Sequence, residues 1–277
     1  MPEGPEIRRA ADKVEAVIKD TPLEKVEFGL PQLKPYAKQL EREKVLRMET
    51  RGKALITHFS NALSMYSHNQ LYGVWHTCKR NELPDTNRQL RVGFHTKTHS
   101  AILYSASDIS IWPSQTIHEH PFLQRVGPDV LNGSVTEELV LERLRSKAFY
   151  NRALSGLYLD QRFMAGLGNY LRSEILFAAG VHPSLKSSHL DDEQLRGLAH
   201  HTLAICKRSY ETGGYTVYTE LREVLEAKGI NFEGTRFMVF DREEQPCRVC
   251  ATPIKRQTYN GRRLYWCSQC QRSEPDF

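Results

Sequence analysis

The sequence predicts an α+β fold: an N-terminal helix, an antiparallel β-sandwich, a helical middle section and a C-terminal zinc-binding hairpin. Three observations lead to this prediction: an apolar stripe of helical period near the start, a series of short β-branched runs up to about residue 105, and four cysteines in two close pairs near the end. Because the residue pattern changes near His120 and again near Arg236, we expect three domains, spanning 1–125, 126–235 and 236–277.

Composition and charge narrow the class of protein. Of the 277 residues, 40% are hydrophobic and 26% are charged, which is ordinary globular usage and excludes a disordered chain. Lys and Arg total 38 against 33 Asp and Glu, so the net charge of +5 fits a polyanionic partner without proving one. We find neither a basic leader nor an apolar run near the roughly 18 residues of a membrane helix. We therefore expect a soluble cytoplasmic protein that has no membrane partner.

The first predicted element is a helix that starts at Pro5 and ends before Asp20. One face of it carries the apolar residues Ile7, Ala10, Ala11, Val14, Val17 and Ile18. The runs after it predict strands at 26–30, 45–49, 54–59, 63–67, 74–78, 90–95 and 101–105. Their lengths and turn-rich separators are typical of an antiparallel sandwich or barrel.

The middle of the chain has a helical pattern. We expect helices at 136–145, 154–163, 170–179 and 192–210, and a helix-like stretch at 219–227 within the ambiguous segment 212–234. Gly166 and Gly168 separate the second of these helices from the third. The last part of the chain predicts short strands at 237–240, 254–258 and 263–266.

The cysteine pairs predict a structural zinc site. Cys247 and Cys250 are followed, after sixteen residues, by Cys267 and Cys270, which is the spacing that places four thiolates around one tetrahedral zinc. Two disulfides or free thiols are the less favoured alternative. Since four cysteines leave no coordination position open for catalysis, we expect one structural zinc per chain.

The segment between the cysteine pairs predicts a basic hairpin. Asn260-Gly261 is a preferred two-residue turn, and it places Arg262 near the tip. Six basic residues and no acidic ones lie between 247 and 272. Such a hairpin is suited to nucleic acid, although basic hairpins are also common as solvated surface.

The start of the sequence has both a chemical and a structural explanation. Removal of Met1 leaves Pro2 with a free secondary amine at the N-terminus of a helix, where the helix dipole disfavours the protonated form. An uncharged amine is a nucleophile that forms Schiff bases with carbonyl-like carbons. Glu3 and Glu6, in the same first turn, can cap the helix or shuttle protons. Ordinary helix capping is the simpler explanation of these residues. Lys53 lies at the start of a predicted strand, and its simpler explanation is a solvated surface lysine.

Taken together, the motifs resemble the formamidopyrimidine-DNA glycosylase and endonuclease VIII family. The segments that carry the resemblance are MPEGPE at 1–6, RGK at 51–53, SHNQLYGVW at 67–75, LYSASD at 103–108, HPFLQRVGPD at 120–129, GLGNYLR at 166–172 and the four-cysteine hairpin. The resemblance implies a bifunctional DNA glycosylase and AP lyase of base excision repair. It implies double-stranded DNA with oxidised bases, mainly pyrimidines, or abasic sites as the partner, and a monomer associated with the bacterial nucleoid through DNA.

The resemblance also implies roles for particular residues. Pro2 attacks C1' of the damaged nucleotide, and Glu3 moves protons as the base leaves. Lys53 donates a proton to the sugar and binds phosphate, and Arg262 contacts phosphate and aids the second step of β,δ-elimination.

Further residues are implied to bind DNA. Residues 159–179 are similar to the helix-two-turns-helix element of the family, with Asn169 at the start of its second helix, and Arg125 matches another DNA-contacting position. Gln70, Leu71 and Tyr72 match the wedge that fills the stack when a base is flipped out. The simpler explanation of this triplet is a routine strand edge.

Two alternatives stay open at this point. Residues 212–236 form a longer segment than we expect for endonuclease VIII, and residues 212–216 resemble the formamidopyrimidine branch, which favours oxidised purines as an alternative substrate. The other alternative is a non-catalytic zinc-ribbon protein that only binds DNA.

Overall fold

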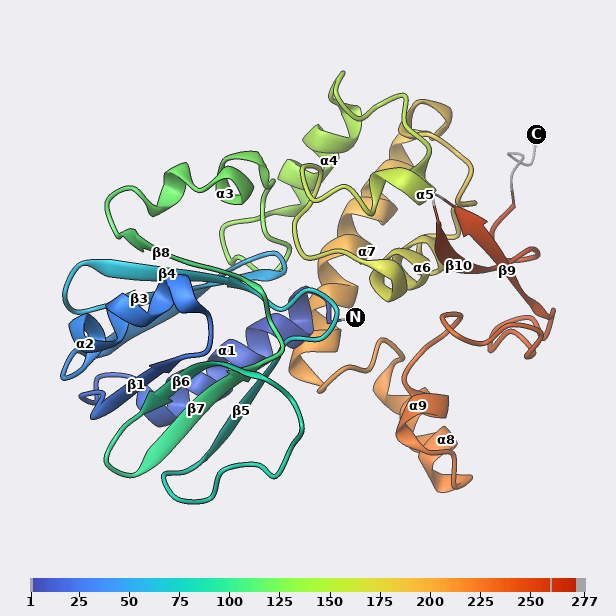
Figure 1. Ribbon diagram of the computed structural model, residues 1–277. Helices are drawn as coiled ribbons and strands as arrows, with labels where there is room; N and C mark the ends of the chain where they lie inside the picture. The colour runs from blue at the N-terminus through green and yellow to red at the C-terminus, as the bar shows by residue number, and fades with distance from the viewer. Residues whose placement is uncertain (1, 260, 273–277) are drawn as a thin grey trace. The chain divides into compact units, whose positions relative to one another are not determined.

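The computed structural model describes residues 2–259 and 261–272 (Figure 1). The chain divides into two compact units, unit 1 at 1–126 and unit 2 at 127–277, and each is described by itself. A separate third domain at 236–277 stays a prediction. None of the helices in the described residues is long and apolar enough to cross a membrane.

Unit 1 begins with helix α1 (Gly4–Ile18), close to the predicted position. Its apolar face is buried through Ile7, Val14 and Ile18. The backbone N–H of Glu3 donates to Glu6 Oε2 at 3.0 Å, which satisfies one of the donors that a helix start leaves without a backbone partner. The sequence therefore places an acidic first turn beside Pro2.

Two antiparallel four-stranded sheets make up most of unit 1. The first sheet has the order β2-β3-β4-β8, with β2 (Val45–Arg51), β3 (Ala54–Phe59), β4 (Leu63–His68) and β8 (Asp108–Pro113). The second sheet has the order β1-β6-β7-β5, with β1 (Lys25–Phe28), β5 (Val74–Lys79), β6 (Leu90–His95) and β7 (His99–Tyr104). One apolar cluster draws side chains from α1 and from both sheets, which confirms the predicted β-rich N-terminal half with a helix.

Short elements complete unit 1. They are the 3₁₀ helices η1 (Pro31–Tyr36) and η2 (Ile117–Glu119) and the helices α2 (Ala37–Leu40) and α3 (Pro121–Arg125). Strand β8 is absent from the predicted set, although Ile109 and Ile111 alternate with polar residues in it.

Unit 2 is mainly helical. Its helices are α4 (Glu137–Arg145), α5 (Leu154–Leu157), α6 (Asn169–Ala178), α7 (Asp192–Glu211), α8 (Thr219–Ala227) and α9 (Phe232–Thr235), with a 3₁₀ turn η3 (Ser187–His189). Every residue of α6 from Tyr170 to Phe177 is buried, so this helix is central to the core of unit 2. The predicted helical character of the middle section is confirmed.

The predicted helix at 154–163 is too long, because α5 ends at Leu157. After Leu157, side chains bind backbone N–H and C=O groups that a continued helix would use for its own hydrogen bonds. Asp160 Oδ1 accepts the N–H of Arg162 at 2.9 Å, and Gln161 Nε2 donates to the carbonyl of Leu167 at 2.9 Å. These contacts stabilise turns in place of a second helical segment.

The predicted strand at 237–240 is wrong for a similar reason. The backbone N–H groups of Met238, Val239 and Phe240 donate to the buried carboxylate of Glu174, at 2.8, 2.8 and 2.9 Å. A carboxylate on α6 therefore takes the donors that a neighbouring strand would need.

The C-terminal hairpin is present as β9 (Ile254–Tyr259) and β10 (Arg262–Cys267). The strands pair from Tyr259 opposite Arg262 to Ile254 opposite Cys267. The predicted Asn260-Gly261 turn includes Asn260, which lies outside the described residues. Arg262 is the first residue of β10, next to this turn.

Candidate functional site

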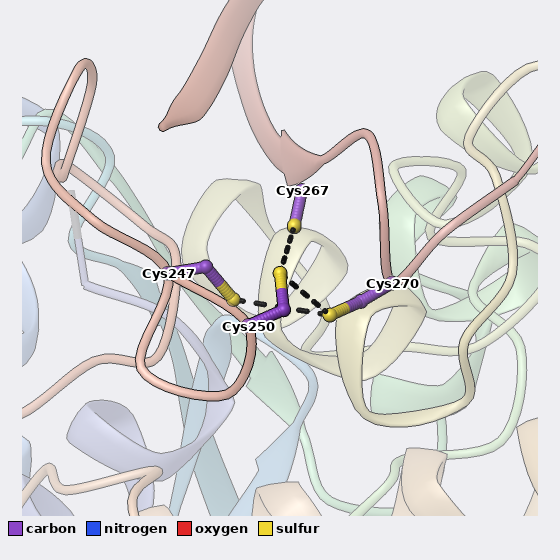
Figure 2. Close-up of side chains that lie close together, drawn as sticks. All are labelled: Cys247, Cys250, Cys267 and Cys270. Atoms are coloured by element: carbon purple, nitrogen blue, oxygen red, sulfur yellow. Dashed lines mark hydrogen bonds between the residues drawn. The ribbon is translucent and has the colours of Figure 1, made fainter. Parts of the chain in front are cut away.

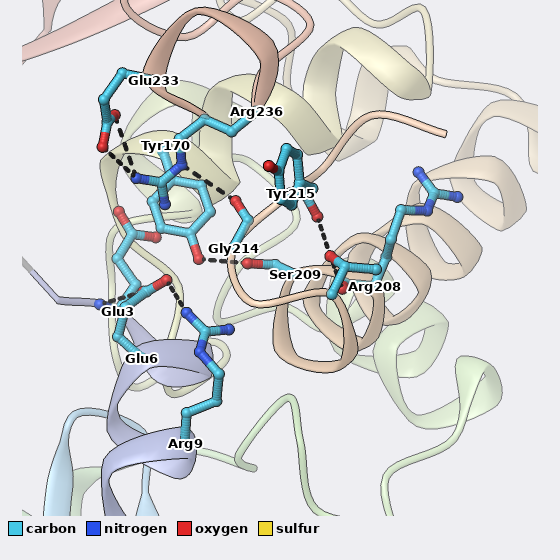
Figure 3. A network of polar contacts seen from close by, with 11 residues as sticks. Glu3, Glu6, Arg9, Tyr170, Arg208, Ser209, Gly214, Tyr215, Glu233 and Arg236 are labelled. Atoms are coloured by element: carbon cyan, nitrogen blue, oxygen red, sulfur yellow. Dashed lines mark hydrogen bonds and ion pairs between the residues drawn. The ribbon is translucent and has the colours of Figure 1, made fainter. Parts of the chain in front are cut away.

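The N-terminal part of the candidate site lies at the start of α1. Pro2 is half-buried and precedes Glu3, which has only 2% of its surface exposed. Glu6 accepts the Glu3 N–H with one carboxylate oxygen and Arg9 Nη2 with the other, the latter at 2.8 Å (Figure 3). These bonds fix the backbone directly after Pro2, so Pro2 lies at the positive end of the helix dipole.

Lys53 occupies the two-residue turn between β2 and β3. Gly52 adopts a φ of 65°, and Arg51 pairs with Ala54 across this turn. Ala54 also pairs with His68 at the end of β4, so Lys53 and His68 are neighbours. Burial lowers the pKa of His68, nearby Asp108 raises it, and the positive charge of Lys53 lowers it further. The net effect favours a neutral imidazole beside an ammonium group.

The predicted wedge forms an exposed turn between β4 and β5. Leu71 and Tyr72 expose 51% and 67% of their surface, so the turn presents two adjacent large side chains to solvent. Gln70 has a positive φ of 51°, and its N–H donates to His68 Nδ1 at 2.9 Å. The turn is thus connected to the Lys53–His68 pair, and it projects two apolar groups from unit 1.

Asn169 is the first residue of α6, as predicted. Its Oδ1 accepts Arg172 Nη2 at 2.7 Å, and the same nitrogen donates to the carbonyl of Arg263 in β10 at 2.8 Å. Arg172 Nη1 donates to the carbonyl of Ser155 at 2.7 Å. The fully buried Arg172 guanidinium therefore links the start of α6 to the strand that begins with Arg262.

The remaining predicted DNA contacts are exposed cations. Arg125 lies at the end of α3 in unit 1, and its Nε donates to the carbonyl of Pro121 at 2.9 Å. Arg262 and Arg263 are exposed at the start of β10 in unit 2. Both positions suit contact with a polyanion.

The four cysteines of the hairpin come together in space (Figure 2). All four sulfur atoms lie within 4.8 Å of one another. The Sγ of Cys250 lies 3.4 Å from that of Cys267 and 3.5 Å from that of Cys270. Zinc with Zn–S bonds of about 2.3 Å holds four tetrahedral sulfurs roughly 3.8 Å apart. The cluster therefore fits a zinc ion, and its four thiol ligands fit a structural site.

The segment 212–236 is ordered around arginine and aromatic side chains. The guanidinium of Arg222 lies 4.0 Å from the centre of the Tyr215 ring, and the Tyr215 hydroxyl donates to Glu226 at 2.9 Å. Arg236 Nε donates to the carbonyl of Gly214 at 3.2 Å (Figure 3). No residue of α8 in this segment is buried, so stacking of arginine on aromatic rings stabilises the segment in place of an apolar core.

Sequence reasoning missed two residues of these groups, His68 and Arg172. Both lie inside motifs that carry the resemblance, but the resemblance assigns roles to other residues of those motifs and none to these two. Hairpin register was a usable signal for His68, because pairing with Ala54 places it beside the Lys53 turn. The role of Arg172 depends on a contact with Arg263, which no local pattern shows.

These features define the class of protein. Residues 1–107 match the formamidopyrimidine-DNA glycosylase N-terminal domain, and residues 126–220 match the formamidopyrimidine-DNA glycosylase H2TH domain. The two matches cover most of the chain. The chain therefore belongs to the formamidopyrimidine-DNA glycosylase family.

Individual relatives are similar over nearly the whole chain. The chain is 52% identical over 273 residues to Endonuclease 8 of Escherichia coli (strain K12 / DH10B), covering 98% of this chain and 100% of the relative. It is 50% identical over 272 residues to Endonuclease 8 of Salmonella enteritidis, with the same coverage.

Solved structures share the fold. The Lactococcus lactis Fpg in complex with DNA containing an abasic site has a TM-score of 0.80 at 18% identity, covering 98% of this chain and 100% of that one. The same enzyme with DNA containing an oxidised pyrimidine also has a TM-score of 0.80, at 19% identity, with the same coverage.

Proposed function

We propose that the protein is a bifunctional DNA glycosylase and AP lyase of base excision repair, acting as a monomer on double-stranded DNA in the bacterial cytoplasm. The observation that carries this proposal is the 52% identity to Endonuclease 8 over 98% of the chain, combined with Pro2 and the buried Glu3 at the start of α1. A protein that only binds DNA has no use for an amine nucleophile next to a buried carboxylate.

In the proposed reaction, Pro2 provides the nucleophile once Met1 has been removed. Its secondary amine attacks C1' of the damaged nucleotide, the glycosidic bond breaks, and Glu3 moves the proton that the departing base needs. The sugar ring then opens to a Schiff base on Pro2. Loss of the C2' proton expels the 3' phosphate, and a second elimination releases the 5' phosphate.

Cationic groups assist these steps. Lys53 protonates the sugar and binds a neighbouring phosphate, and Arg262 binds a phosphate and promotes the second elimination. His68 supports the Lys53 end of this group, since its neutral ring can donate through Nε2 while Nδ1 accepts from Gln70. Zinc, when bound by the four cysteines, stabilises the hairpin that carries Arg262 and takes no part in the chemistry.

Binding uses both units. Asn169 and the backbone N–H groups at the start of α6 bind a DNA phosphate, and Arg125 binds another. Gln70, Leu71 and Tyr72 fill the space that a flipped base leaves in the stack, which limits the cost of unstacking. The exposure of Leu71 and Tyr72 supports this role.

The proposed substrates are oxidised bases, mainly pyrimidines. The ordered segment at 212–236 supports a second candidate, oxidised purines, because residues 212–216 resemble the formamidopyrimidine branch. A cleavage panel separates the two: duplexes with thymine glycol, dihydrouracil or an oxidised purine, each opposite every base. A preference of at least tenfold in kcat/KM for the purine lesions would favour the second candidate.

Covalent trapping tests the reaction itself. Borohydride should reduce the Schiff base between the protein and an abasic or thymine-glycol duplex and leave a covalent complex. The complex should be lost when a non-removable tag precedes Pro2. Trapping that survives the tag would show that the nucleophile is another group, and binding without strand cleavage would favour the non-catalytic alternative.

A further inference from the structure

The turn that leads into α6 is buried. All residues at 163–168 are buried, and Gly166 has a positive φ of 99°, which favours glycine. Because water has little access to such a turn, its backbone N–H and C=O groups need partners within the protein. The groups that supply these partners fix the position from which α6 starts.

One side chain makes three hydrogen bonds to the backbone on both sides of this turn. Gln161 Oε1 accepts the N–H of Gly166 at 3.0 Å. Its Nε2 donates to the carbonyl of Leu167 at 2.9 Å and to the carbonyl of Leu159 at 3.2 Å. A backbone N–H only donates and a backbone carbonyl only accepts, so these partners leave one orientation for the amide.

The backbone of Gln161 is also fixed. Its carbonyl accepts the N–H of Gly127 at 2.9 Å. A Cβ atom on Gly127 would lie 2.4 Å from the carbonyl oxygen of Arg162, so this close approach requires glycine. The N–H of Arg162 donates to Asp160 Oδ1 at 2.9 Å. The half-buried Gln161 is therefore held both at its backbone and at its amide.

We propose that Gln161 is a positioning residue that holds the start of α6 in the geometry in which it binds a DNA phosphate. The inference rests on the proposed function, in which Asn169 and backbone N–H groups at this helix start bind that phosphate. Gly168 has an extended backbone, and its carbonyl accepts the N–H of Arg172 at 3.0 Å in the first turn of α6. Gln161 binds the carbonyl directly before Gly168, at Leu167, so it acts through the turn and not by contact with DNA.

A fixed turn favours the phosphate contact for two reasons. Hydrogen bonds from N–H groups weaken steeply when their distance or direction is wrong. A turn that is already ordered also loses no conformational freedom when DNA binds. Without the Gln161 amide, the N–H of Gly166 and the carbonyl of Leu167 lose a partner inside a buried turn, and the turn must change shape to reach water. The contact with one phosphate is then lost, while the contacts made by other residues remain.

Neutralising the phosphates one at a time measures this contact. In duplexes with a tetrahydrofuran site, each phosphate near that site is replaced in turn by an uncharged methylphosphonate, and Kd is measured. For the wild type, replacing the phosphate bound at α6 should weaken binding about tenfold, because a charged hydrogen-bond acceptor is lost. Asn169→Ala identifies this phosphate, since replacement there should cost this variant less than it costs the wild type.

Variants of Gln161 test the assignment. Gln161→Met keeps the length of the side chain without the amide; it should bind the unmodified duplex about five- to tenfold more weakly, and replacing the phosphate at α6 should cost it less than about twofold. Gln161→Asn, whose amide is too short to reach both Gly166 and Leu167, should give the same result and serves if the first variant fails to fold. Gln194→Met is the matched control, because Gln194 Oε1 accepts the N–H of Asp191 at 3.1 Å at the start of α7. It should keep the wild-type cost at every phosphate.

Each failure has its own meaning. If the wild type neither binds the tetrahydrofuran duplex nor cleaves a duplex with a natural abasic site, the proposed function is wrong. If the wild type is active but the folded Gln161 variants keep the wild-type cost at the α6 phosphate, the inference about Gln161 is wrong. Weaker binding by the same factor on every duplex, with unchanged ratios between the phosphates, would show a merely structural side chain and would also overturn it.

Discussion

The guanidinium of Arg172 on α6 donates from Nη2 to the backbone carbonyl of Arg263 in β10, at 2.8 Å. The two residues are separated by 91 positions in the sequence, and the Arg172 side chain is fully buried. The same guanidinium binds Asn169 Oδ1 and the carbonyl of Ser155. The first residue of α6 and the start of β10 are thus connected through one buried cation.

Replacing this cation should damage both stability and DNA binding. In Arg172→Met, the acceptors at Asn169, Ser155 and Arg263 lose their donor, and we expect unfolding free energy to fall by about 2–4 kcal/mol. Hydrogen exchange should show faster exchange of the amides at 262–267, and affinity for an abasic duplex should fall as β10 loses its tether. Arg145→Met removes an exposed arginine paired with Asp192, and should cost no more than about 1 kcal/mol. Equal effects of the two variants would contradict the tether.

The cysteine cluster predicts the metal content of the protein. Metal analysis of the purified protein should find one zinc per chain, because four sulfurs lie within 4.8 Å of one another. Chelation should remove amide protection from 254–267 and weaken DNA binding at least about tenfold, since metal binding and folding of such a hairpin are coupled. Cys250→Ser should behave like the chelated protein, whereas Cys78→Ser, at a cysteine outside the cluster, should keep its zinc. A metal-free hairpin with unchanged exchange rates would refute a structural role for zinc.

Local patterns predicted best those strands and helices whose formation is explained by the periodicity of their own residues. The strands at 54–59 and 90–95 and the helix at 219–227 have the predicted ends. The strand predicted at 237–240 is wrong because its donors bind Glu174, which is more than sixty residues away. Polar side chains that bind a distant backbone leave no periodic signal in the sequence.

The candidate site shows the same limit. The cysteine spacing predicted a cluster that the structure brings together, because all four residues belong to one small hairpin. His68 and Arg172 act through strand pairing and through a buried contact across unit 2, so neither has a signature of its own. The roles of Pro2, Glu3, Lys53 and Arg262 are still predictions that need the trapping and cleavage experiments.

Lys53 should contribute a phosphate contact that depends on salt. The slope of log K against log salt is negative, and removing one contact of this kind makes it shallower by about 1. Lys53→Gln should therefore bind an abasic duplex more weakly at low salt and lose less affinity as salt rises. Lys38→Gln removes the same charge from an exposed position on α2 and serves as the control. Titrations between 50 and 200 mM salt, in which both variants keep the wild-type slope, would exclude Lys53 from the phosphate contacts.

Asp160 should make part of the stability of unit 2 depend on pH. Burial raises the pKa of this carboxyl, but hydrogen bonds from Arg162 and Arg152 lower it by more, so the pKa lies well below its ordinary value of 3.8. The Asp160 carboxylate accepts Arg152 Nη1 at 2.6 Å and Arg162 Nη2 at 2.8 Å, and its side chain is only 11% exposed. The folded state consequently holds the charged form, while the unfolded chain takes up a proton first as the pH falls.

The stability that this carboxylate contributes is complete above pH 3.8 and is lost as the pH falls toward the lower folded-state pKa. Asp160→Asn should therefore reduce the unfolding free energy by about 1–3 kcal/mol at neutral pH. The difference from the wild type should shrink below pH 3.8, measured by urea unfolding at a series of pH values. Asp192→Asn removes a carboxylate that is 75% exposed and should cost no more than about 1 kcal/mol. A difference for Asp160→Asn that stays constant through the acid range would mean that the arginine pairs do not stabilise the turn after α5.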